Sequence, residues 1–176
     1  MIIDLKNITE ELLVKKALDR DWWVVQDEDD QILGLETPLE LDIKVSRAGE
    51  KYLIKGEIAG GVRVRCDRCL EPFRWDFKSA FSVYLVVPEP TTDQADIELL
   101  EEEMEVDFTE GEAVELDQII KEQVYLSLPM KCICKDDCLG LCPGCGVNLN
   151  REACQCKQET GHPAFSKLQS LMENRG

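Results

Sequence analysis

Residues 62–87, VRVRCDRCLEPFRWDFKSAFSVYLVV, contain two runs of alternating side chains on either side of a cysteine pair. Valines alternate with arginines before Cys66, and apolar side chains occupy every second position after Cys69. Alternation of this kind predicts β-strands with one buried face. We therefore predict a long hairpin whose turn holds both cysteines. The apolar residues of its second strand are Phe73, Trp75, Phe77, Phe81, Val83, Leu85 and Val87.

The cysteine pair in this turn has two chemical interpretations. A thioredoxin-like redox pair lies where a strand runs into a helix, whose N-terminus lowers the pKa of a thiol. Strands on both sides of Cys66 and Cys69 favour a knuckle instead, which is a tight turn that directs two sulfur atoms at one metal ion. A thiol oxidoreductase remains the alternative.

The chain has nine cysteines, and eight of them form pairs separated by one to three residues. Two pairs are close together in residues 140–156, GLCPGCGVNLNREACQC, where glycines permit the left-handed backbone of a knuckle. We predict that this quartet binds one ion in a zinc-ribbon-like module and that the two remaining pairs bind another. The predicted ligands are Cys66, Cys69, Cys134 and Cys138 in one site, and Cys142, Cys145, Cys154 and Cys156 in the other.

The type of ligand predicts the metal. Four thiolates in a closed tetrahedral site suit Zn²⁺, so we predict one or two structural zinc ions. Disulfides are disfavoured because clustered cysteines in a reducing compartment are more often metal ligands, and an odd number cannot pair completely. An iron–sulfur cluster is one alternative, and reduced thiols without metal are another for the split site. We interpret the remaining Cys132 as a bystander that could replace Cys134.

The remaining patterns predict an α+β fold. We expect an antiparallel sheet or partly closed β-barrel with few helices, followed by the Cys-rich module. Alternation over residues 39–46 and 52–58 predicts two more strands, and Gly60 with Gly61 predicts a turn after them.

Three segments favour helices. Asn7 with Glu10 resembles a capping box, which predicts a short helix ending near Leu18. Apolar residues recur at helical spacing over residues 116–124, and Pro163 begins a final amphipathic segment.

Charge is distributed unevenly along the chain. The formal net charge is −16, and residues 79–120 contain thirteen Asp or Glu and no Lys or Arg. We interpret this as a solvated acidic loop at 88–115 within a core domain, 1–130, or alternatively as a binding site for a basic partner. The Cys-rich tail, 131–176, is the second predicted domain.

Five cations lie on the polar face of the predicted hairpin or at its turn. They could bind phosphate groups, or they could neutralise metal-bound sulfur atoms. A sequence pI near 4.4 disfavours general coating of nucleic acid, so binding would need a local patch. The cations are Arg63, Arg65, Arg68, Arg74 and Lys78.

The motifs of common catalytic sites are absent from the sequence. There is no G-x-S-x-G, phosphate-binding glycine loop or H-E-x-x-H, so we predict no enzymatic activity. The one histidine, His162, precedes Pro163, and we assign it a capping or surface role. The first residues do not resemble a secretory signal and no run reaches membrane-spanning length, so we expect a cytoplasmic protein.

Several of these motifs together resemble the YceD/DUF177 family. They are VRCDRCLEPF at 64–73, LPMK at 128–131, the pair Cys134 and Cys138, and GLCPGCGVNLN at 140–150. The resemblance covers nearly the whole chain in order. It implies a role in accumulation of large-subunit ribosomal RNA, and thus in ribosome biogenesis, with no established enzymatic activity. Some relatives lack the C-terminal quartet, which implies that the two sites are separable, and Cys132 stands where a proline is expected.

The residues and the resemblance together predict a non-catalytic binding factor. Its basic patch would face large-subunit ribosomal RNA or the precursor particle, while its acidic segment holds off or captures a basic ribosomal protein. The alternatives are a protein-only adaptor for a basic partner, or a thiol oxidoreductase that uses Cys66 and Cys69.

Overall fold

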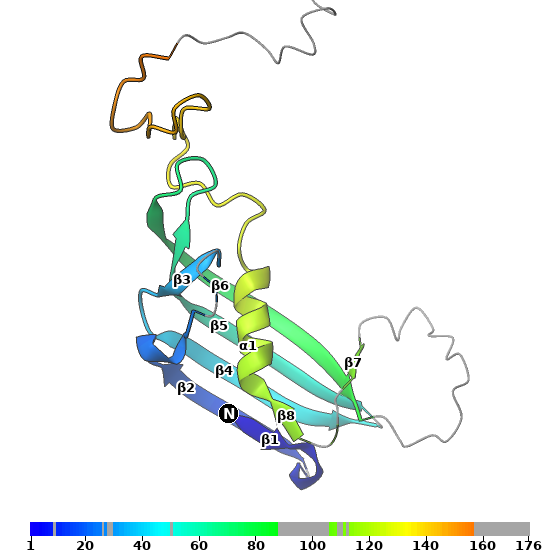
Figure 1. Ribbon diagram of the computed structural model, residues 1–176. Coiled ribbons are helices and arrows are strands. Elements are labelled where there is room, and N and C mark those ends of the chain that lie inside the picture. Colours follow the sequence, from blue (N-terminus) through cyan, green and yellow to red (C-terminus); the bar gives the residue numbers. More distant parts are fainter. Residues whose placement is uncertain are drawn as a thin grey trace, which may run out of the picture.

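The two alternating runs form the longest strands of the computed structural model, β5 (Lys51–Arg65) and β6 (Pro72–Val86). They pair antiparallel along their whole length, and Figure 1 shows them as a long curved hairpin. The hairpin predicted from residues 62–87, with both cysteines in its turn, is thus confirmed. The structure describes residues 1–8, 10–25, 27, 30–49, 51–87, 106–108, 111 and 113–156.

A six-stranded, mostly antiparallel sheet is built around this hairpin. Its order is β2-β4-β5-β6-β7, and β3 pairs with β5 beyond the point where β4 ends. The strands at its two ends, β2 and β7, do not pair, so the described residues form an open sheet and not the barrel that we considered. The remaining strands are β2 (Glu11–Leu18), β3 (Ile32–Leu35), β4 (Leu39–Ala48) and β7 (Val106–Phe108), which joins β6 in parallel.

Helix α1 (Leu116–Leu126) lies across one face of the sheet, as its apolar spacing predicts (Figure 1). A two-stranded sheet of β1 (Ile2–Asp4) and β8 (Ala113–Glu115) leads into it. The apolar sides of helix and sheet form one core, which gives an α+β architecture. No helix in the described ranges is long and apolar enough to span a membrane. The fully buried side chains of this core include Ile43, Val45, Ile58, Val62, Val64, Leu116, Ile120 and Val124.

The predicted N-terminal helix is wrong. Residues Glu11–Leu18 form β2, and only a 3₁₀ turn, η1 (Leu5–Asn7), precedes it. The side chain of Asp4 caps that turn by accepting a hydrogen bond from the Lys6 amide. All eight residues of β2 pair with β4, so tertiary pairing overrides a weak local helical pattern.

The predicted turn at Gly60 and Gly61 is also wrong, because both residues lie inside β5. A Cβ atom on Gly61 would lie 2.7 Å from Oδ1 of Asp76, and one on Gly60 would lie 3.1 Å from Cδ1 of Leu39. Glycine at these positions therefore permits neighbouring strands to approach closely and does not reverse the chain.

Parts of the predicted acidic loop and tail can be compared with the structure. Within residues 88–115, the structure places β7 and β8 in what we expected to be loop. The rest of the acidic run, 88–105, lies outside the described residues. The predicted helix from Pro163 and the role of His162 also lie outside them.

Trp22 ends a second 3₁₀ turn, η2 (Arg20–Trp22), and Trp23 follows it. Trp23 is buried, and its ring centroid lies 5.6 Å from that of Tyr125 on α1. Nε1 of Trp22 donates to Asp117 over 2.9 Å. The segment between β2 and β3 is thereby fixed against the helix.

Candidate metal centres

The first knuckle joins β5 to β6. The Leu70 amide donates to the Cys66 carbonyl over 2.9 Å, and the Cys66 amide donates to the Glu71 carbonyl over 3.0 Å. A strand follows Cys69, so the pair does not stand at the start of a helix as in a thioredoxin-like site.

The second knuckle repeats this bonding pattern. The Gly146 amide donates to the Cys142 carbonyl over 2.8 Å, and the Cys142 amide donates to the Val147 carbonyl over 2.8 Å. The residue after the second cysteine is left-handed in both turns, with φ of 58° at Leu70 and 74° at Gly146. The two turns therefore share one backbone geometry, and each supplies two of the four thiols of a different candidate metal site.

The first cluster consists of Cys66, Cys69, Cys134 and Cys138, whose sulfur atoms all lie within 4.8 Å of one another. Two opposite pairs, Cys66 with Cys138 and Cys69 with Cys134, have sulfur atoms 3.8 Å apart. Metal–sulfur bonds of about 2.3 Å in a tetrahedron give sulfur separations of about 3.8 Å. This cluster therefore fits a four-coordinate metal ion.

Backbone amides stabilise negative charge on the first cluster. Burial is the largest influence on Cys66 and opposes its ionisation, but the amides of Cys134, Cys69 and Arg68 together lower its pKa to about 6. Burial and neighbouring sulfur atoms raise the pKa of Cys134 to about 12. Amide donors of this kind also stabilise metal-bound thiolates.

The second cluster consists of Cys142, Cys145, Cys154 and Cys156. The sulfur of Cys154 lies 3.2 Å from that of Cys142 and 3.5 Å from that of Cys145. The amides of Cys145 and Gly144 and the side chain of Cys154 lower the pKa of Cys142 to about 6. Hydrogen bonding with the sulfur of Cys154 raises the pKa of Cys156 to about 12.

The two clusters differ in exposure. Cys66, Cys69 and Cys138 are at most 4% exposed, whereas Cys145 and Cys156 are exposed to solvent. All nine cysteines lie in the described ranges, and none forms a disulfide. The structure thus groups all eight predicted ligands as the sequence predicts. Two clusters of four thiols that could bind metal ions are present.

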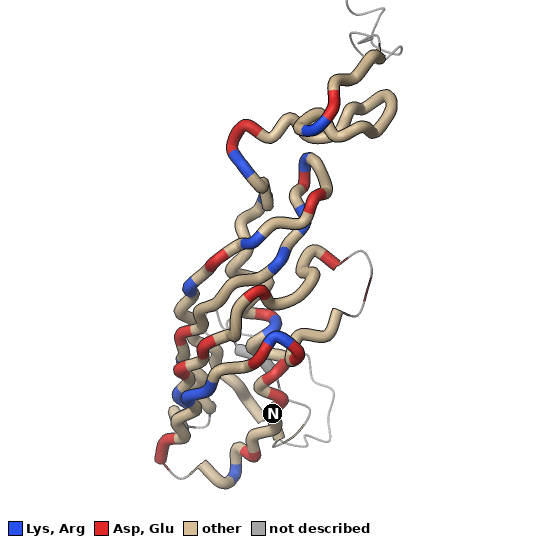
Figure 2. The backbone as a smooth tube through the Cα atoms, turned by 90° about the vertical axis from the view of Figure 1, so that its left-hand side faces the viewer, with Lys and Arg blue, Asp and Glu red and all other residues tan. Residues whose placement is uncertain are grey.

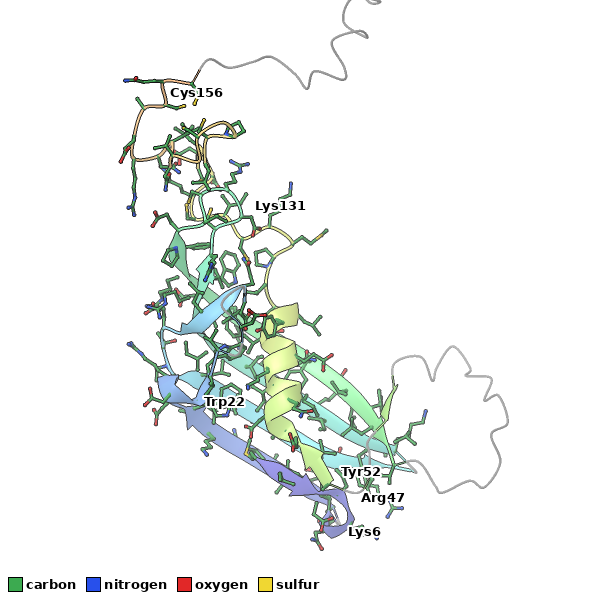
Figure 3. The ribbon with its side chains drawn as sticks, viewed as in Figure 1. Lys6, Trp22, Arg47, Tyr52, Lys131 and Cys156 are labelled. Carbon is green, nitrogen blue, oxygen red and sulfur yellow. The ribbon has the colours of Figure 1, made fainter. Side chains whose placement is uncertain are left out.

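Polar contacts hold the two knuckles against each other. Arg68 donates from Nη1 to the Cys138 carbonyl over 2.9 Å, and its own carbonyl accepts from the Leu141 amide. Glu71 receives a hydrogen bond of 2.8 Å from Arg151. Figure 3 shows this end of the molecule beyond Lys131 and near Cys156. Sequence reasoning missed Glu71 and Arg151, since nothing local relates two residues 80 positions apart.

Cys132 is not part of either cluster. It is buried, and its amide donates to the Asp67 carboxylate over 2.7 Å while its carbonyl accepts from the Asp67 amide. Burial raises the pKa of its thiol. The structure therefore supports the bystander interpretation, and Cys134 takes the ligand position.

The five cations of the predicted patch have different surroundings. Arg74 bonds to Asp76 at 2.7 Å and Lys78 to Glu57 at 2.9 Å, and these carboxylates raise the pKa of each cation. Arg63 meets Glu36 less closely, at 3.7 Å. Arg65 ends β5, and the Arg68 guanidinium donates to the carbonyl of Cys138 in the first cluster. Figure 2 shows basic and acidic positions interspersed along the strands rather than gathered by sign.

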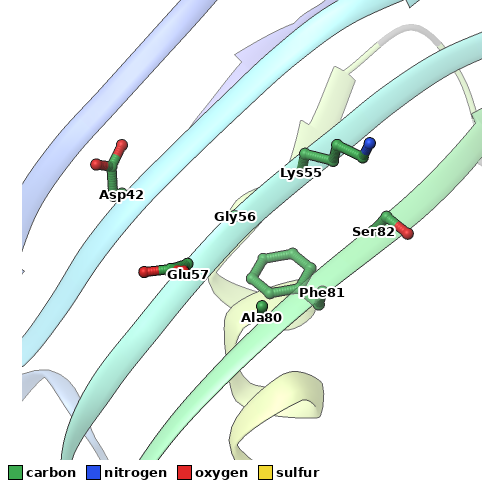
Figure 4. A pocket seen from close by; sticks show the side chains of 7 residues that line it. All are labelled: Asp42, Lys55, Gly56, Glu57, Ala80, Phe81 and Ser82. Atoms are coloured by element: carbon green, nitrogen blue, oxygen red, sulfur yellow. The ribbon is translucent and has the colours of Figure 1, made fainter.

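A shallow hollow lies on the exposed face of the sheet above β4, β5 and β6, as Figure 4 shows. Ala80 and Ser82 are small, and the charged side chains around them carry both signs. Such a surface lacks the enclosed apolar lining of a typical small-molecule pocket. The hollow is lined by Asp42, Lys55, Gly56, Glu57, Ala80, Phe81 and Ser82.

Backbone strain at Leu70 can be tested by substitution. Left-handed backbone costs a residue other than glycine about 1–2 kcal/mol, and Leu70 occupies the position that glycine fills in the second knuckle. We expect Leu70→Gly to be more stable than Leu70→Ala by about 1 kcal/mol. Chemical denaturation of both variants measures this, and equal stabilities would show that the knuckle is not strained at Leu70.

The fold and clusters define a class of protein: an open antiparallel sheet, covered by one helix, with two four-cysteine sites at one end. Within that class, the family model described as large ribosomal RNA subunit accumulation protein YceD matches residues 54–172. The chain belongs to the YceD family. The match includes β6, α1 and all eight clustered cysteines.

Curated relatives support this membership. The uncharacterized protein Rv2926c of Mycobacterium tuberculosis is 34% identical over 134 residues, which cover 76% of this chain and 62% of the relative. The protein named large ribosomal RNA subunit accumulation protein YCED homolog 1, chloroplastic, of Arabidopsis thaliana is 25% identical over 78% of this chain and 49% of the relative. The chain thus spans about half to three fifths of these relatives. No solved structure matches it significantly.

Proposed function

We propose that this protein is a non-catalytic, cytoplasmic factor that supports accumulation of large-subunit ribosomal RNA by binding the precursor RNA or a protein of the precursor particle. The family description carries this proposal, together with the names of the plant relatives. Two rigid cysteine knuckles on a packed sheet are suited to recognition, because they present fixed surface residues.

We further propose that both clusters bind Zn²⁺. Sulfur separations of 3.8 Å in the first cluster suit tetrahedral zinc. The second cluster offers the same four thiol ligands at shorter separations of 3.2 and 3.5 Å, and sites with four protein ligands are usually structural. When bound, the ion supplies positive charge that holds the thiolates together. The four thiols of each cluster would fill a tetrahedral site and leave no open coordination position for substrate, which supports a structural role over thiol or metal catalysis.

The RNA-binding residues that we propose are Arg63, Arg65, Arg68, Arg74 and Lys78. A protein-only adaptor remains the second candidate. The net charge of −16 and the close ion pairs of Arg74 and Lys78 favour it, since both reduce attraction to phosphate. Its acidic residues would attract a basic protein of the particle.

The proposed function can be tested in cells that lack the protein. We expect the ratio of large-subunit to small-subunit ribosomal RNA to fall and to recover when the wild-type chain is supplied. A Cys69→Ser chain should restore the ratio poorly because the first knuckle is disrupted, whereas Cys132→Ser should restore it. An unchanged ratio in the depleted cells would contradict the proposal.

Affinity recovery of the tagged protein distinguishes the two candidates. If the protein binds RNA, large-subunit precursor RNA should be enriched over small-subunit RNA, and nuclease should release the remaining particle proteins. If the protein is an adaptor, a basic particle protein should stay bound after nuclease and dissociate in high salt. Recovery without any large-subunit component would exclude both candidates.

A further inference from the structure

We propose that a hollow flanked by Arg20 and Arg63 binds one nucleotide of single-stranded RNA. This inference rests on the proposed function and identifies a specific RNA contact for it. Its central observation is that two arginines from distant segments line one hollow beside exposed apolar side chains. The proposal places Arg63 of the proposed RNA-binding residues in a defined site and adds Arg20 to them.

The hollow has a volume of about 550 Å³ and lies between η2, the segment after it, β3 and β5. Ligand sites usually fall between about 300 and 1,000 Å³, so one nucleotide fits this size class. Arg20 lies at the start of η2, and Arg63 projects from the exposed face of β5. The side chains of Val24 and Val25, which are 65% and 37% exposed, form part of the wall.

The walls of the hollow are fixed by the fold. Trp23 lines it and packs against Tyr125, whose hydroxyl donates to Asp30 over 2.7 Å. On the opposite side, β3 changes register between Ile32 and Gly34 as it pairs with β5. No atom outside the neighbouring residues lies within 4 Å of a Cβ built on Gly34, so this wall leaves the space open.

The hollow is lined by two arginines and two carboxylates, Asp21 and Glu36, and neither arginine is held in a close ion pair with a described residue. Arg20 forms no ion pair with any described residue. Arg63 lies 3.7 Å from Glu36, a loose contact compared with the 2.7 Å pair of Arg74. Because a guanidinium has five donors in a planar fork, Arg63 can bind a phosphate group without first losing a tight partner.

The pairing of β5 with β6 adds a second electrostatic reason. Arg63 lies directly opposite Arg74 in the register. Like charges in this position repel each other. Asp76 neutralises Arg74 through a close ion pair, so Arg63 is the member of the pair whose charge a bound phosphate can neutralise.

The rest of the hollow suits the remainder of a nucleotide. The exposed valines can contact the flat face of a base or the ribose. Asp21 and Glu36 also line the hollow and can accept hydrogen bonds from base N–H groups. RNA duplexes hide these groups in a narrow major groove, whereas single strands present them, so a single strand is the ligand that fits.

The test uses the full-length protein and a fluorescein-labelled, ten-nucleotide single-stranded RNA of mixed sequence. We expect Arg20→Ala and Arg63→Ala each to weaken binding about tenfold, the cost of one charge-assisted hydrogen bond. Each should also reduce the slope of log affinity against log salt by about 0.7, because one phosphate contact is lost. Lys15→Ala and Arg47→Ala, which remove exposed cations of β2 and β4 away from the hollow, are matched controls, and their affinities should stay within about twofold.

A Glu36→Gln variant distinguishes a ligand site from a structural contact. It removes the carboxylate that competes for Arg63, so RNA should bind about threefold more tightly. An Arg20→Lys variant should recover part of the affinity lost in Arg20→Ala, since it restores the charge. Circular dichroism and metal content of every variant should match those of the wild type, because all the substituted side chains are exposed or half-buried.

Three results would overturn the inference: unchanged affinity in Arg20→Ala, equal weakening by Lys15→Ala, or equal binding of a ten-base-pair RNA duplex. Absence of any binding by the wild type would overturn it as well. That last result leaves the proposed function standing if affinity recovery from cells still enriches large-subunit components. The proposed function fails separately, when those components are absent from the recovered material.

Discussion

Cys69→Ser should remove one metal ion per chain and lower the free energy of unfolding by about 4 kcal/mol. The first cluster joins the β5–β6 hairpin to a segment 65 residues further along the chain. A crosslink that closes a loop of this length restricts the unfolded chain by about 4 kcal/mol in the chain-entropy estimate. Metal binding couples to folding in the same way, because the ligands converge only in the native state.

Elemental analysis and chemical denaturation measure this effect, and two further cysteines supply controls. Cys145→Ser should also remove one ion, and its effect on stability should be smaller, about 3 kcal/mol in the same estimate, because the second cluster closes a shorter loop between Cys142 and Cys154. Cys132→Ser should retain both ions, since Cys132 lies outside the clusters. A Cys69→Ser protein with full metal content and unchanged stability would disprove the first site.

The second large effect concerns the helix that covers the sheet. Ile120→Ala should lower the free energy of unfolding by about 2–5 kcal/mol, the usual range for truncating a fully buried isoleucine. Ile120 is 0% exposed on the side of α1 that packs against the sheet. The loss combines the transfer free energy of the deleted groups with the cavity that they leave.

Leu126→Ala is the matched control on the same helix. Leu126 is 69% exposed, so its truncation should change stability by less than about 0.5 kcal/mol. Urea denaturation followed by far-ultraviolet circular dichroism measures both variants. Equal effects of the two substitutions would mean that α1 does not pack on the sheet through Ile120.

The sequence predicts the central hairpin because its information is local. Alternation before Cys66 and after Cys69 reports directly which side chains face the core, and the spacing of the cysteines reports a turn. The same local logic predicts α1, whose apolar residues recur at helical spacing. The sequence also predicts how the cysteine pairs combine into two clusters. Once the two pairs in residues 140–156 are assigned to one cluster, only two pairs remain for the other.

Short or ambiguous patterns fail where distant pairing decides the outcome. Residues Glu11–Leu18 carry an apolar pattern compatible with helix or strand, and β4 selects the strand by pairing with all of it. Gly60 and Gly61 have the sequence pattern of a turn. In the structure they leave room for Leu39 and Asp76, which become their neighbours only in the folded sheet.

By itself the sequence determined the long hairpin, the covering helix and the eight clustered thiols, because periodicity and spacing act over a few residues. Only the tertiary structure decided that the described sheet stays open, that Arg74 and Lys78 pair closely with carboxylates, and that Arg20 and Arg63 line the same hollow. These features depend on side chains that strand register and the packing of distant segments bring together. Their energies come from contacts between residues far apart in the chain, which no local pattern contains.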